Sequence, residues 1–198
     1  MADKKHTILR HLNDMKALDR EIRSAIDRQQ KDERLKNQAD ASRVVESIES
    51  TLAQQSERLE KRIDALGGNS TTAELKERLA QALGLVEGLW QNLRDKPVSL
   101  ALRDDYAALN VAAAHYTMMH AAARALDDRT TADLAFQNLR ELTPLIVEVS
   151  QVMPQVVVAE IADEHEGVDL AAATEAAKTT HQAWQPETAE SETVKTTA

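Results

Sequence analysis

Two polar residues stand at positions where a helical stripe of apolar side chains would otherwise continue. Asp19 follows the spacing set by Leu12 and Met15. Gln55 interrupts a second stripe, three residues after Leu52. A carboxylate and an amide inside a helical core supply oxygen atoms that could ligate a metal ion or a small polar ligand. We favour a hydrogen bond that fixes helix register, because single polar residues at core positions serve that purpose in helical bundles.

Histidines and glutamates farther along the chain are the other candidates for chemistry. His115 and His120 are five residues apart, about 140° around a helix, so one metal ion cannot easily take both. We expect one to face the core and the other solvent, as structural histidines, because residues 106–126 contain no Asp or Glu. Glu141 and Glu148 are two helical turns apart and could act as an acid/base pair. Off the apolar stripe, they are better explained as a solvated edge.

Composition narrows the class of protein. The 198 residues include no Cys, which excludes disulfides, Cys-ligated metals and thiol nucleophiles. The net charge is −9 and aromatic residues make up 3%, so nucleic-acid binding is disfavoured. No Gly-rich phosphate loop or nucleophile elbow is recognisable. Without a secretory signal or a run of 18 apolar residues, we expect a cytoplasmic protein that does not enter membranes.

The apolar periodicity predicts an all-α chain. Three- and four-residue intervals between apolar side chains indicate amphipathic helices, with a cap at Asp40 or Ser42 opening the second and Gly67-Gly68 ending it. Pro144 should kink the last long helix, and Pro154 should kink or stop it. The expected helices cover residues 6–30, 40–66, 73–94, 98–126 and 131–162. We divide the chain into a bundle, residues 1–162, and an acidic extension, residues 163–198, which is helical over 168–184 and then disordered.

Four long helices with a shorter crossover helix resemble a known arrangement. The segments LNDMKALDREI, LAQQSERLEKRIDALGG, AAAHYTMMHAAARAL and LRELTPLIVEV resemble the YciE/YciF-type branch of the ferritin-like superfamily over residues 5–162. This resemblance implies a ferritin-like four-helix bundle with a crossover helix. It also implies the position of a carboxylate-bridged two-metal site, which needs a Glu from two helices and a Glu-x-x-His pair from each of the other two.

Most of the residues that this metal site needs are replaced. The resemblance places Asp19 at the first helix's acid, and Gln55 and Arg58 at the second helix's acid and its partner. Ala114 stands before the His-Tyr pair, and Glu141 remains in the fourth long helix. No Glu-x-x-His occurs in the chain. We therefore expect a degenerate metal site without a cofactor, because an arginine there would repel a metal ion.

The resulting hypothesis is a non-enzymatic ferritin-like protein. The resemblance implies a bacterial, stress-associated role and a homodimer, for which Leu89 and Trp90 are the expected contact residues. The first alternative is a metal-dependent oxidase or oxidoreductase that binds iron or manganese at a non-standard site. Its candidate residues are Asp19, Gln55, His115 and Glu141. The second alternative is a helical adaptor unrelated to ferritins.

Overall fold

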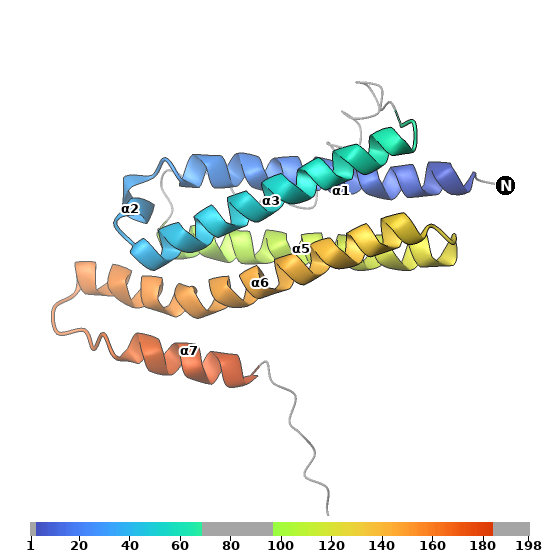
Figure 1. Cartoon of the computed structure of the whole chain (residues 1–198). Helices are drawn as coiled ribbons and strands as arrows, with labels where there is room; N and C mark the ends of the chain where they lie inside the picture. Colours follow the sequence, from blue (N-terminus) through green and yellow to red (C-terminus); the bar gives the residue numbers. More distant parts are fainter. Residues whose placement is uncertain (1–2, 69–96, 184–198) are drawn as a thin grey trace, which may run out of the picture.

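The computed structural model describes residues 3–68 and 97–183, and every regular element in those residues is a helix (Figure 1). The expected all-α class is therefore confirmed. Four long helices pack pairwise in a closed ring, in which α1 contacts α3, α3 contacts α6, α6 contacts α5 and α5 contacts α1. The elements are α1 (Lys4–Gln29), α2 (Glu33–Lys36), α3 (Ala39–Ala65), α5 (Val98–Ala125), α6 (Arg129–Glu164) and α7 (Ala172–Ala183).

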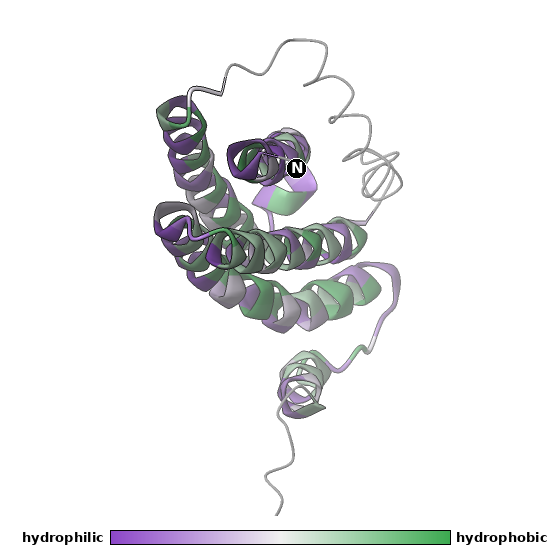
Figure 2. Cartoon of the chain, turned by 90° about the vertical axis from the view of Figure 1, so that its right-hand side faces the viewer, coloured by the Kyte–Doolittle hydropathy of each residue, from purple (hydrophilic) through white to green (hydrophobic). Residues whose placement is uncertain are grey.

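The four long helices enclose one apolar core. Its members recur every three or four residues along each helix, so they form the face that each helix turns inward. Figure 2 shows apolar segments concentrated in α5 and α6, and these two helices make the closest pair of the bundle. Small side chains permit that approach: Ala108, Ala112 and Ala123 of α5 and Ala132 and Ala135 of α6 are fully buried.

At the two ends of α3, the predicted N-terminal cap is wrong and the predicted C-terminal stop is confirmed. The helix begins at Ala39 after Gln38, which forms no side-chain cap, so Asp40 and Ser42 lie inside it and the expected cap there is wrong. Asp40 still lies in the first turn, where a negative charge meets the positive end of the helix dipole. At the other end Gly67 has φ +63°, and the N–H of Gly68 donates to the carbonyl of Ile63 at 3.0 Å. This left-handed termination confirms the predicted stop.

Helix α6 runs without a break through both of its prolines. The stop considered at Pro154 does not occur, and Val156, two residues after it, is helical and buried. Pro144 lies on the exposed side, where water can satisfy the carbonyl that its missing N–H leaves free.

Two shorter helices, α2 and α7, lie outside the four long ones. The polar segment 27–39 contains α2, whose Leu35 is buried and anchors the turn between α1 and α3. The Ala-rich segment expected over 168–184 forms α7, which packs against α6 and buries Ala173. The short helix expected over 73–94 and the tail at 185–198 lie outside the described residues.

A charge pair ties the end of α3 to the start of α6. Asp128 caps α6 by accepting the N–H of Thr131 at 3.0 Å, and both of its oxygens accept from Nη2 of Arg62 at 2.8 Å. Burial alone would raise the pKa of Asp128, but the bonds from Arg62 and Thr131 lower it below its usual value.

Asp128→Asn should test this charge pair, because it keeps a capping oxygen but removes the charge that Arg62 neutralises. We expect unfolding in urea at pH 7 to require about 1 kcal/mol less free energy. The difference should shrink as the pH falls through the lowered pKa of Asp128, where the native carboxyl becomes neutral. Asp133→Asn, at an exposed position of α6, is the control and should leave stability unchanged.

Candidate functional site

Polar side chains from all four long helices are gathered in the middle of the apolar core. Asp19 of α1, Gln55 of α3, Tyr116 of α5 and Asn138 of α6 have no exposed surface. Two charged residues border them, with exposed side-chain fractions of 25% for Arg58 and 32% for Glu141. The members are close enough to influence one another: the charge of Asp19 contributes to raising the pKa of Tyr116, and the side chain of Gln55 contributes to lowering the pKa of Glu141. We call these six residues the central polar cluster.

Hydrogen bonds connect three helices through Asn138 of α6. Its side-chain oxygen accepts from Nη1 of Arg58 at 2.5 Å, and its backbone carbonyl accepts from Nε2 of Gln55 at 3.0 Å. Its side-chain nitrogen donates to the hydroxyl of Tyr116 at 3.1 Å. Asn138 therefore joins α3 to α5 across α6. This bond is the buried hydrogen bond that was expected for Gln55.

Arg58 also forms an ion pair with Glu141. Nη1 of Arg58 donates to Oε2 of Glu141 at 2.7 Å, and Gln137 donates to the other carboxylate oxygen at 3.1 Å. Burial alone would raise the pKa of Glu141, but the bonds from Arg58 and Gln137 and the positive charge of Arg58 lower it. Glu141 is therefore a charged, fully engaged carboxylate, and it is poorly suited to accept a proton as a base.

Asp19 has the opposite environment. Neither of its carboxylate oxygens accepts a hydrogen bond of good geometry from the described residues. Burial raises the pKa of Asp19 to about 7, and the neighbouring Ser56 and Arg23 act in the opposite direction without cancelling this effect. Burial, followed by the charge of Asp19, also raises the pKa of the Tyr116 hydroxyl. Asp19 is thus a carboxyl group whose charge the core tolerates poorly.

The central polar cluster does not fit a two-metal centre. Such a centre is held by several carboxylates and histidines that neutralise two cations. In residues 3–68 and 97–183, no three His, Asp or Glu side chains are grouped so that they could hold a metal ion. The cluster instead contains a guanidinium group that Asn138 and Glu141 already bind. A further cation here would be repelled by Arg58 and would compete with it for Glu141.

The predicted site residues separate into two groups. Asp19, Gln55 and Glu141 meet in the cluster, whereas His115 does not take part in it. His115 instead lies near His11 of α1, whose pKa is lowered mainly by burial and further by the charge of His115. His115 and His120 are both half-buried, so the expected division into one core-facing and one solvent-facing histidine is not observed. The Nδ1 atom of His120 lies 2.8 Å from the carbonyl oxygen of Ala132. Leu89 and Trp90 lie outside the described residues.

Two members of the cluster were not identified as functional from the sequence. They are Tyr116 and Asn138. The signal for Asn138 was available, because it stands between the inward positions Ala135 and Leu142 at intervals of three and four residues. A polar residue at such a position marks a buried hydrogen-bonding group in the same way as Asp19 and Gln55.

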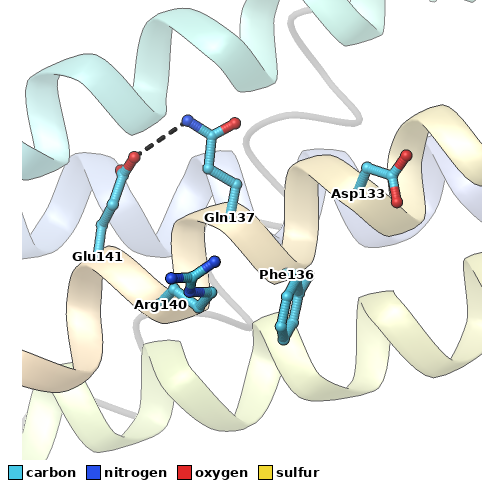
Figure 3. A pocket seen from close by; sticks show the side chains of 5 residues that line it. All are labelled: Asp133, Phe136, Gln137, Arg140 and Glu141. Carbon is cyan, nitrogen blue, oxygen red and sulfur yellow. Dashed lines mark hydrogen bonds between the residues drawn. The ribbon is translucent and has the colours of Figure 1, made fainter.

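A shallow hollow lies on the outside of α6, next to the cluster (Figure 3). It has a volume of about 530 Å³ and is lined by Asp133, Phe136, Gln137, Arg140 and Glu141. The Arg140 guanidinium lies 5.8 Å from the centre of the Phe136 ring. All five residues belong to one helix, so the hollow is an open surface feature and offers no enclosed pocket for a substrate.

Comparison of the chain with family models, curated proteins and solved structures finds no match. The similarity to ferritin-like proteins remains a prediction from the sequence.

Proposed function

We propose that this chain is a non-enzymatic helical-bundle protein in which an arginine occupies the place of the metal ions of ferritin-like proteins. The carrying observation is the position of Arg58, which binds Asn138 and Glu141 of the facing helix at the bundle centre. One guanidinium supplies a positive charge that would otherwise be supplied by a bound cation. This arrangement supports a structural role for Glu141, whose carboxylate binds Arg58.

Several properties of this proposal come from the sequence resemblance alone. They are the bacterial origin, the stress-associated role and the self-association of the chain. A helical adaptor without ferritin ancestry would share the same bundle and the same internal ion pair. For either ancestry, the protein would act through its surface, because the described residues hold no group arranged for metal-dependent oxidation.

Metal analysis tests the proposal directly. The protein is incubated with Fe(II) under anaerobic conditions or with Mn(II), desalted and measured by inductively coupled plasma mass spectrometry. We expect substoichiometric metal that is the same in the wild type and in Glu141→Gln. About two equivalents per chain, as a dinuclear site requires, with loss in Glu141→Gln, would contradict the proposal and support the metal-dependent oxidase.

A further inference from the structure

Helix α7 is held to α6 through one narrow stripe of small side chains. Its only buried residue is Ala173, and Ala177, one turn later, is half-buried. Every other residue of α7 is exposed. Each of the four long helices, in contrast, buries between eight and eleven residues. The contact between α7 and α6 is therefore small enough to break while the core of the bundle stays intact.

The helical conformation of α7 depends on this contact. The helix has 12 residues, and a helix of this length is marginal in water by itself. It also contains Thr174, Thr179 and Thr180, which are weaker helix formers than the alanines around them. Detachment from α6 should therefore also unwind α7.

The connection between α6 and α7 has the properties of a hinge. Gly167 adopts a left-handed conformation with φ +75°, and a Cβ atom added there would meet no atom within 4 Å. Leu170 keeps 64% of its surface exposed, so its side chain does not anchor the connection to the bundle. Residues 160–175 include six acidic residues and no Lys or Arg, and these like charges repel one another across the turn. These features favour movement of α7 about residues 165–170.

The surface beside α7 belongs to the most apolar part of α6. Figure 1 shows α7 along the C-terminal half of α6, and both Figure 1 and Figure 2 place it on the side of α6 away from α1. Between Pro144 and Ala159, Glu148 is the only charged residue. Among the described helices, α6 is long and apolar enough to cross a membrane by length and composition, but only 22% of its most apolar window is buried. Departure of α7 would enlarge an apolar face that already exposes Val157 and Ile161.

We propose that α7 is a strap that covers part of the C-terminal half of α6 and opens about residues 165–170 while the four-helix bundle stays folded. Opening unwinds α7 and exposes apolar surface of α6, so the strap controls access to that face. The strap shares no residue with the central polar cluster. The inference thus goes beyond the proposed function, and it can fail while metal analysis still supports that function.

The reactivity of introduced cysteines tests the strap, because the chain has no Cys of its own. Labelling by a maleimide is followed for Ala173→Cys at the contact, for Val149→Cys in the core face of α6, and for Ala176→Cys on the exposed side of α7. Ala173→Cys should react at least about a hundredfold faster than Val149→Cys, because opening the strap needs less free energy than unfolding the bundle. It should react more slowly than Ala176→Cys, which needs no opening.

Labelling in urea below the unfolding transition separates opening of the strap from unfolding of the bundle. The rate for Ala173→Cys should depend weakly on urea, since opening exposes little surface, whereas the rate for Val149→Cys should rise steeply. Equal rates with equal urea dependence for these two variants would mean that α7 opens only together with the bundle, and would overturn the proposal. A rate for Ala173→Cys equal to that of Ala176→Cys would show that α7 does not cover α6, and would overturn it as well.

Discussion

Asp19→Asn is expected to remove most of the pH dependence of stability between pH 5 and pH 8. The wild type should lose about 3 kcal/mol of unfolding free energy over this range, because an unfolded Asp ionises near pH 3.8 and the buried one near pH 7. Between these values the folded state binds more protons than the unfolded state, so stability falls as the pH rises. Asparagine preserves the size and polarity of the side chain but has no charge to lose.

Urea unfolding of both proteins at several pH values gives the comparison. The curves should lie close together at pH 5 and separate as the pH approaches 8, with the variant the more stable. Asp19→Leu should show the same flat profile and greater stability, because a buried carboxyl without hydrogen-bond partners is replaced by an apolar group. Glu46→Gln, at an exposed carboxylate of α3 that does not act on Asp19, is the control and should keep the wild-type slope. Parallel profiles for wild type and Asp19→Asn would show that Asp19 is charged without penalty.

The sequence was sufficient to predict the four long helices, α7 and three members of the central polar cluster. Periodicity is a local property, and it located α1, α3, α5 and α6 because each of them buries a continuous stripe. Asp19 and Gln55 could be found because each interrupts such a stripe. Spacing alone paired Glu141 with Glu148, and only the resemblance grouped Glu141 with Asp19 and Gln55, since it lies at the edge of the inward face.

The partners of these residues could not be predicted, because they depend on how the helices are rotated against one another. Arg58 was recognised as incompatible with a metal, but its bonds to Asn138 and Glu141 require α3 and α6 to meet at one height. The wrong cap at Asp40 has a similar cause. Capping motifs are short, and the polar segment before α3 offered several residues of the capping type. Tertiary contacts through α2 and its buried Leu35 determine where the chain turns.

The residues of the cluster differ in how well the bundle satisfies their hydrogen-bonding groups. Asn138 and Arg58 satisfy one another and hold three helices in register, whereas Asp19 remains without a hydrogen-bond partner. A protein selected only for stability would replace Asp19 by an apolar residue. The other fully buried carboxyl groups among the described residues, Asp104 and Asp105, accept hydrogen bonds from Arg103 and Gln29, so Asp19 differs from them in lacking such a bond.

Arg58→Met is expected to destabilise the protein by about 3 kcal/mol at pH 7, because it leaves the buried oxygen of Asn138 without its donor and Glu141 without its counter-ion. The methionine retains much of the apolar stem, so the loss reports mainly on the guanidinium. Glu141→Gln should cost less, about 1 kcal/mol, because Arg58 keeps its bond to Asn138 and both charged groups are partly exposed.

The double variant Arg58→Met/Glu141→Gln separates the ion pair from the rest of the network. Removing both charges should cost less than the sum of the single effects, and the difference should be about 1 kcal/mol. Urea unfolding at low and at high salt provides the measurement, and the difference should decrease with salt because the pair is partly solvated. Strict additivity would mean that Arg58 and Glu141 do not stabilise one another. A wild type no more stable than Arg58→Met would show that the guanidinium does not hold the centre of this bundle together.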